Sequence, residues 1–207
     1  GALGAGIGVF VGDLYLSTFG LTNPFLSLIA GVPANFVGFY LLGWLMHRWG
    51  SWRLFLWASL VGLVVGNLIA ASVVVFYIST LLGALWPLDV QLGTTIGFTL
   101  FWITTMLPFV LAIVPVLVKA VSKSRLSSLT SGSWLKWRTV SYSTTVKDSL
   151  AVAAIFGVVT LILVLTPLGD VLFATAKLDA FLIKSLTAVT ALTTLLFGPL
   201  VAVLTKP

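Results

Sequence analysis

Residues 53–82 decide the fold and read RLFLWASLVGLVVGNLIAASVVVFYISTLL. After Arg53 this stretch contains no charged residue and no proline, and its apolar residues do not alternate with polar ones. A helix needs roughly 20 apolar residues to cross a bilayer core about 30 Å thick, whereas a transmembrane strand needs only about 9–11 residues of alternating polarity. The stretch is therefore predicted to be a transmembrane α-helix.

The composition of the 207-residue chain extends this prediction to its whole length. Hydrophobic residues make up 59% of it and charged residues only 8%, whereas a soluble domain carries about 25% charged residues. Five further apolar stretches are candidate spans: residues 1–20, 24–46, 92–118, 150–167 and 180–204. We therefore expect an all-α, polytopic membrane helix bundle with about six transmembrane helices, which forms a single integral membrane domain over residues 1–207.

The positive charges divide between the two sides of such a bundle. Of the eleven Lys and Arg residues, only Lys177 and Lys184 belong to one side. The other nine belong to the opposite side: Arg48, Arg53, Lys119, Lys123, Arg125, Lys136, Arg138, Lys147 and Lys206. Because Lys and Arg near helix ends are retained in the cytoplasm, we expect both termini to be cytoplasmic, in a plasma-membrane protein. The net charge of +6 then reports topology and does not indicate nucleic acid as a partner.

Residues 119–149 contain most of these charges and are expected to form a basic cytoplasmic connection. The aromatic residues among them, such as Trp134 and Trp137, allow two interpretations. The segment is either a docking surface for a cytoplasmic partner or anionic membrane lipid, or a plain loop whose aromatic side chains anchor at the headgroups.

The residues that most enzymes and metal sites require are scarce. The chain has no cysteine and no glutamate, and His47 is its one histidine, which excludes thiolate, multi-histidine and di-iron carboxylate sites. The sequence contains no GxSxG, P-loop or HExxH motif. We therefore expect no enzymatic activity, no cofactor and no metal, and a function in binding, transport or assembly within a membrane.

Small residues recur at every fourth position on three of the predicted spans. These ridges are Gly4, Gly8 and Gly12; Ala30, Ala34 and Gly38; and Ala58, Gly62, Gly66 and Ala70. Small residues let helix backbones approach closely, which is a main source of helix association in lipid. The ridges either pack helices of this chain together, or at least one of them faces a separate membrane subunit.

Four polar residues are candidates for a substrate-binding site. Asp13, Asn35 and Asn67 lie inside predicted spans, where polar groups cost free energy unless they find a partner. Asn23 lies in a tight turn, where it is expected to cap the second helix beside a ligand pocket. The two asparagines inside spans could instead hydrogen-bond each other or neighbouring backbone, as contacts between helices. The nearest intramembrane base that could pair with Asp13 is Lys184.

Three segments, GAGIGVFVGDL (residues 4–14), NPF (residues 23–25) and IAGVPANFVG (residues 29–38), resemble the substrate-binding S-components of energy-coupling factor transporters. The resemblance covers about residues 1–80. It implies a six-helix bundle that captures a vitamin, a metal ion or a related nutrient from outside and docks on an energising membrane subunit. It also implies that Asp13, Asn23 and Asn35 lie near the pocket and that the second or third ridge is the docking face.

A solute-binding uptake component of this kind is the leading interpretation of the sequence. A second is an oligomeric ion channel with Gly/Pro-kinked helices and Lys184 as an intramembrane charge. A third is a non-catalytic scaffold subunit of a larger membrane complex. A closed cavity near Asp13, Asn35 and Asn67 would favour the first interpretation, whereas a continuous water path or a symmetric assembly would favour the second.

Overall fold

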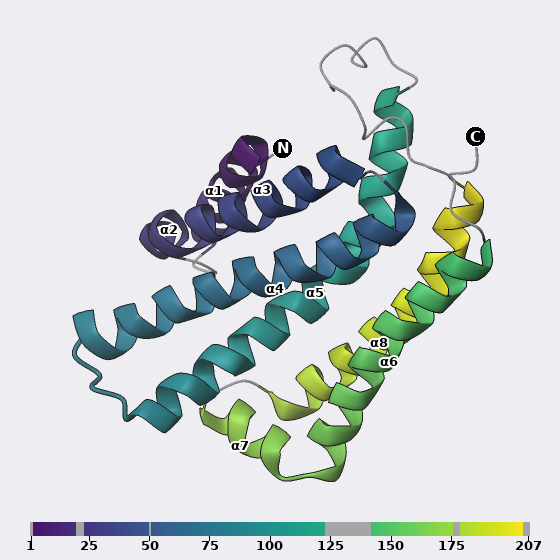
Figure 1. Ribbon diagram of the computed structural model, residues 1–207. Helices are drawn as coiled ribbons and strands as arrows, with labels where there is room; N and C mark the ends of the chain where they lie inside the picture. Colours follow the sequence, from purple (N-terminus) through teal and green to yellow (C-terminus); the bar gives the residue numbers. More distant parts are fainter. Residues whose placement is uncertain (1, 20–22, 50, 123–141, 176–178, 205–207) are drawn as a thin grey trace.

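The computed structural model describes residues 2–19, 23–49, 51–122, 142–175 and 179–204. Figure 1 shows them as a bundle of helices. In chain order these are α1 (Ala2–Ser17), α2 (Pro24–Leu26), the π-helical turn η1 (Ser27–Gly31), α3 (Val32–Trp49), α4 (Trp52–Phe76), the π-helical turn η2 (Tyr77–Leu81), α5 (Leu88–Ser122), α6 (Tyr142–Leu165), α7 (Leu168–Thr175) and α8 (Ala180–Leu204). The predicted all-α class is confirmed, because each of these elements is helical.

Five helical segments are long and apolar enough to cross a membrane. They are Pro24–Met46, Arg53–Leu81, Leu88–Leu117, Tyr142–Leu165 and Ala180–Leu200. Each corresponds to one of the predicted spans, so the chain is built as a multi-pass helical membrane protein.

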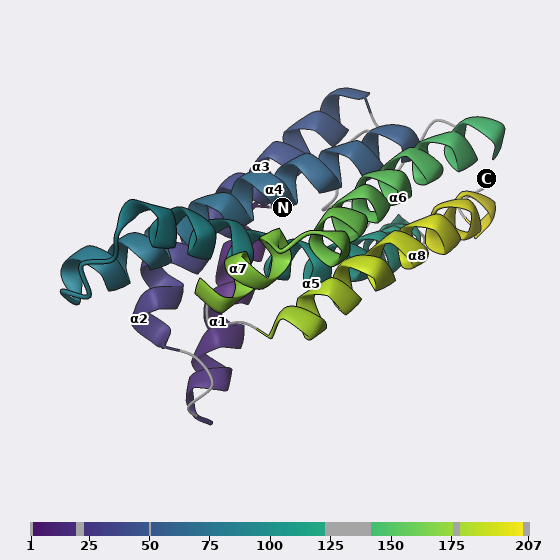
Figure 2. The same cartoon turned by 90° about the horizontal axis from the view of Figure 1, so that it is seen from below.

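The predicted first span, residues 1–20, differs from the other five. The 16 residues of α1 measure about 24 Å at about 1.5 Å per residue, which is less than a bilayer core of about 30 Å. Figure 2 shows α1 lying across the direction of the long helices. Within the described residues, five spans therefore meet the length criterion; whether α1 crosses the bilayer stays a prediction, as does the cytoplasmic N-terminus that depends on it.

The helices pack in the spatial order α1, α3, α4, α5, α8 and α6, each against the next. In Figure 1, α5 accordingly lies between the α3–α4 pair and the α6–α8 pair. The main apolar core includes Phe55 and Leu56 of α4, Leu107 and Leu111 of α5, and Val152 of α6. Because α5 contacts both pairs, it holds the two halves of the bundle together.

The small-residue ridges on α3 and α4 face each other inside this chain. A Cβ atom added to Gly38 would lie 2.7 Å from the carbonyl oxygen of Gly62, and one added to Gly66 would lie 3.0 Å from that of Ala34. All seven residues assigned to the second and third ridges are buried: Ala30, Ala34, Gly38, Ala58, Gly62, Gly66 and Ala70. In this structure they serve internal packing, and a partner subunit could reach them only if the α3–α4 contact opened.

Both ends of the predicted connection 119–149 are helical. The long helix α5 continues to Ser122, and α6 already begins at Tyr142. The remaining residues, 123–141, lie outside the described part of the chain, so both interpretations of this segment stay open.

Candidate functional site

A widened helical turn marks the start of the second span. Pro33 has no N–H group to donate to the carbonyl of Ile29, so a regular α-helix cannot continue through this point. The turn just before it, η1, is π-helical, and the N–H of Val32 donates to the carbonyl oxygen of Ser27. Such π-helical turns occur frequently at functional sites, and this one carries several residues of the cavity described next.

A cavity of about 420 Å³ lies among α1, the α2–η1–α3 segment, α4 and α5. Its lining residues are Val9; Asn23, Leu26, Ser27, Ala30, Gly31 and Asn35; Asn67, Ala70 and Val74; and Trp102 and Met106. The structure thus brings together three predicted site residues, Asn23, Asn35 and Asn67. The fourth, Asp13, lies on α1 one helical turn after Val9, and the position of its side chain lies outside what the structure describes.

Two of the three asparagines have their polar atoms engaged in local structure. Asn23 caps α2 as predicted, because its Oδ1 accepts a hydrogen bond of 2.9 Å from the N–H of Phe25. The Nδ2 of Asn35 donates to the carbonyl oxygen of Gly31 at 2.9 Å. This bond stays within one helical segment, so the amide nitrogen of Asn35 is not used to join α3 to Asn67.

Asn67 and Ser27 are different, because each presents a buried polar atom without a partner. Asn67 is 7% exposed and Ser27 is 5% exposed, and among the described residues neither Asn67 Nδ2 nor Ser27 Oγ has a hydrogen-bond partner. A buried donor left unsatisfied costs about 1–3 kcal/mol. Both residues line the cavity.

Ser27 was not among the predicted site residues. Its signal in the sequence is weak, since a serine inside a span normally bonds back to its own helix. Only the π-helical turn and the packing of α4 against it show that this hydroxyl is buried and unpaired beside Asn67.

The size and lining of the cavity suit a small molecule. Ligand sites typically occupy about 300–1,000 Å³ and are mostly apolar, with a few polar groups that orient the ligand. Beyond Asn35 and Asn67, only a crevice of about 10 Å³ continues between α3 and α4, which is room for about one water molecule. The close contact of Gly38 with Gly62 thus limits the cavity on this side.

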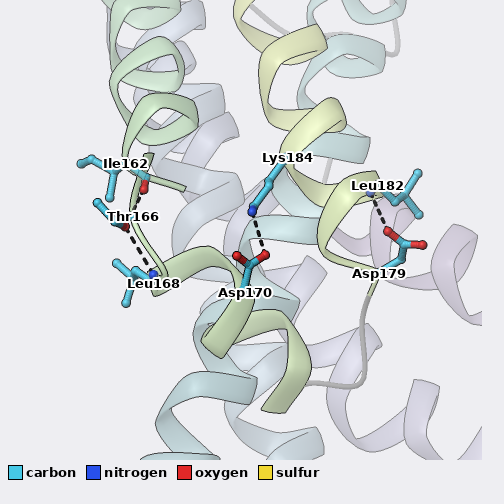
Figure 3. Close-up of polar contacts among 7 residues, drawn as sticks. All are labelled: Ile162, Thr166, Leu168, Asp170, Asp179, Leu182 and Lys184. Atoms are coloured by element: carbon cyan, nitrogen blue, oxygen red, sulfur yellow. Dashed lines mark hydrogen bonds and ion pairs between the residues drawn. The ribbon is translucent and has the colours of Figure 1, made fainter. Parts of the chain in front are cut away.

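Lys184 is not an isolated intramembrane charge. Its Nζ lies 2.7 Å from Oδ1 of Asp170 on α7, as Figure 3 shows. At the start of α8, the helix that carries Lys184, Asp179 Oδ1 accepts a hydrogen bond of 2.9 Å from the N–H of Leu182. Lys184 is thus paired within this chain, because α7 folds back beside the start of α8. The charge of Lys184, which the channel interpretation used, is balanced by Asp170.

A second ion pair joins the starts of α4 and α6. Arg53 Nε lies 3.0 Å from Asp148 Oδ2, with the Arg53 side chain 61% and the Asp148 side chain 10% exposed. Neither ion pair involves a residue of the cavity lining. The charged side chains described here therefore stabilise the two ends of the bundle, and the cavity between them is lined by uncharged residues.

No protein-family model matches this chain, and no match was found among curated proteins or among solved structures. Within the described ranges, no group of three or more His, Cys, Asp or Glu residues could hold a metal ion. The function must therefore be argued from the cavity itself.

Proposed function

We propose that this chain is a membrane solute-binding protein that captures a small nutrient in the cavity among α1, η1, α3, α4 and α5. One observation carries the proposal. Asn23, Asn35 and Asn67 are distant in sequence, yet they line one space of about 420 Å³ together with the unpaired hydroxyl of Ser27. Polar groups at membrane depth that surround a shared cavity are typical of a binding site.

The cavity belongs to the end of the bundle that would face outward. Asn23 and Val74 lie near the ends of α2 and α4 that are opposite to Arg53. The basic connections that contain Arg53 and residues 119–149 are placed in the cytoplasm by their charge. Solute would accordingly enter from outside the cell, and the protein would reside in the plasma membrane.

Uptake against a gradient would require a partner. The sequence has no P-loop that could hold a nucleotide, so we propose that the chain has no enzymatic activity of its own and docks on an energising membrane subunit. The ridges on α3 and α4 are buried, so the docking face would be another part of the lipid-facing surface.

Filling the cavity tests the proposal. Val74 lines the cavity from α4, and the larger side chain of Val74→Trp should narrow it. Leu68→Trp is the matched control, because Leu68 lies on the same helix but is exposed on the lipid-facing surface. Both variants and the wild type would be purified in nanodiscs, incubated with a pool of small metabolites, and compared by native mass spectrometry.

We expect the wild type and Leu68→Trp to retain a small molecule that Val74→Trp does not retain. The proposal fails if all three proteins show the same bound mass or none. A bound mass that corresponds to another protein chain, with no small molecule, would favour the scaffold interpretation instead.

A further inference from the structure

We infer that the cavity takes an uncharged molecule with an apolar body and a hydrogen-bond acceptor, which Asn67 Nδ2 and Ser27 Oγ bind as donors. This assignment rests on the proposed function, since it names the chemistry of the molecule that the cavity would hold. It also narrows the candidate site to one predicted asparagine and one serine that the sequence did not single out.

The donor assignment follows from which polar atoms are already occupied. Asn23 Oδ1 accepts from Phe25 and Asn35 Nδ2 donates to Gly31, so these atoms serve the local backbone. Asn67 and Ser27 line the cavity, and their Nδ2 and Oγ atoms are buried with no hydrogen-bond partner among the described residues. An amide nitrogen can only donate and a hydroxyl can donate or accept. The group that satisfies Asn67 must therefore be an acceptor, such as a carbonyl oxygen or a ring nitrogen.

The absence of charge follows from the lining. None of the described side chains around the cavity is ionisable in the physiological range. Lys184 and Arg53 are already paired with Asp170 and Asp148 at the ends of the bundle. Placing an ion in an apolar site without a counter-charge costs far more free energy than placing a neutral polar group there. An uncharged molecule is thus the class that these walls favour.

The apolar body follows from α5, which supplies Trp102 and Met106 one turn apart on the cavity wall. The indole of Trp102 stacks on Phe98, with ring centroids 5.5 Å apart and an interplanar angle of 16°. This stacking holds the indole in place, and a thioether beside it adapts to varied apolar shapes. This part of the wall therefore suits a flat hydrocarbon or aromatic surface.

Four fluorinated probes of similar shape separate these features. 4-Fluoroacetophenone is neutral and carries one carbonyl acceptor, whereas 1-ethyl-4-fluorobenzene has nearly the same shape without the acceptor. 4-Fluorobenzoate is an anion and 4-fluorobenzylamine is a cation. Binding to the protein in nanodiscs would be measured by fluorine NMR, and Val74→Trp in identical nanodiscs would give the signal due to partition into lipid.

We expect 4-fluoroacetophenone to bind about threefold to tenfold more tightly than 1-ethyl-4-fluorobenzene, as one hydrogen bond allows. Asn67→Leu and Ser27→Ala should each remove most of that advantage and leave binding of 1-ethyl-4-fluorobenzene unchanged, which also shows that the cavity is intact. Ser72→Ala is the matched control, because Ser72 is exposed and its hydroxyl donates to Leu68. If Asn67→Leu does not fold, the binding measurements on Ser27→Ala test the donor assignment by themselves.

Three results would overturn the assignment while leaving a binding cavity in place. They are equal binding of the probes with and without the carbonyl, tighter binding of 4-fluorobenzoate, and tighter binding of 4-fluorobenzylamine. The last result would indicate a carboxylate at the site and would point to Asp13. If Val74→Trp changes the signal of none of the four probes, both the assignment and the proposed function fail.

Discussion

Replacing Gly38 with alanine should weaken the contact between α3 and α4 and lower the stability of the bundle. The added Cβ would lie 2.7 Å from the carbonyl oxygen of Gly62, whereas ordinary contacts begin at 3.4 Å. The two backbones would have to separate by about 0.7 Å, the difference between these distances. Overpacking of this kind costs about 1–3 kcal/mol.

Gly43→Ala on the same helix is the matched control. A Cβ atom at Gly43 meets nothing within 4 Å. In both variants the higher helix propensity of alanine stabilises the helix by about 1 kcal/mol relative to glycine. This contribution cancels when the stabilities of the two variants are compared. Gly38→Ala should therefore be less stable than Gly43→Ala by about 1–3 kcal/mol.

The free energy of unfolding would be measured by titration with SDS in mixed micelles, with helix content followed by far-UV circular dichroism. Gly62→Ala should behave like Gly38→Ala, because a Cβ at Gly62 lies 2.8 Å from the carbonyl oxygen of Gly38. The double variant should cost less than the sum of the two single variants, since both strain one contact. The reasoning is refuted if Gly38→Ala and Gly43→Ala agree to within about 0.5 kcal/mol, the scatter of independent surface changes.

Three further predictions concern the ion pair, the π-helical turn and the topology. Arg53→Ala should destabilise the protein by about 1 kcal/mol more than Asp148→Asn in the same unfolding titration, because removal of Arg53 leaves the mostly buried carboxylate of Asp148 unpaired. Equal losses of unfolding free energy in the two variants would contradict this. Pro33→Ala restores a backbone N–H and should let the turn before it close as α-helix. Binding of 4-fluoroacetophenone should then weaken without loss of thermal stability. Unchanged binding would contradict a role for this turn in the site. The chain has no cysteine, so single cysteines can report which side of the membrane a position faces. Leu85→Cys, at a position that is 82% exposed, should react with an impermeant maleimide added outside intact cells, whereas Ser143→Cys should react only after lysis. The reverse labelling pattern would show that the orientation is inverted.

Three of the five span starts could be read from the sequence. The expected starts at residues 24, 53 and 180 agree with Pro24, Arg53 and Ala180 in the structure, whereas those at residues 92 and 150 lie after the observed starts at Leu88 and Tyr142. Apolar length and the placement of positive charge are properties of each segment by itself, so no knowledge of neighbouring helices is needed. For α1 the apolar residues predict a span, and because the described helix Ala2–Ser17 is shorter than the bilayer core, this span stays a prediction.

Part of the site was also visible in the sequence. Asn35 and Asn67 stood out because polar side chains are costly inside a span. Their separate roles were not visible, since only the structure shows that Asn35 bonds to Gly31 while the Nδ2 of Asn67 lies unpaired beside Ser27. Whether a polar atom is satisfied depends on which groups lie within about 3 Å of it, and a linear pattern does not contain that distance.

The sequence by itself determined that this protein is an all-α membrane bundle whose positive charges are concentrated on one side. It did so because hydropathy and charge act on each helix independently. Tertiary structure alone decided that the small-residue ridges face each other at Gly38 and Gly62, and that Lys184 is paired with Asp170. It also decided that Asn67 and Ser27 share a cavity. These are relations between helices, and they arise only when the whole chain packs, because each depends on distances between residues far apart in sequence.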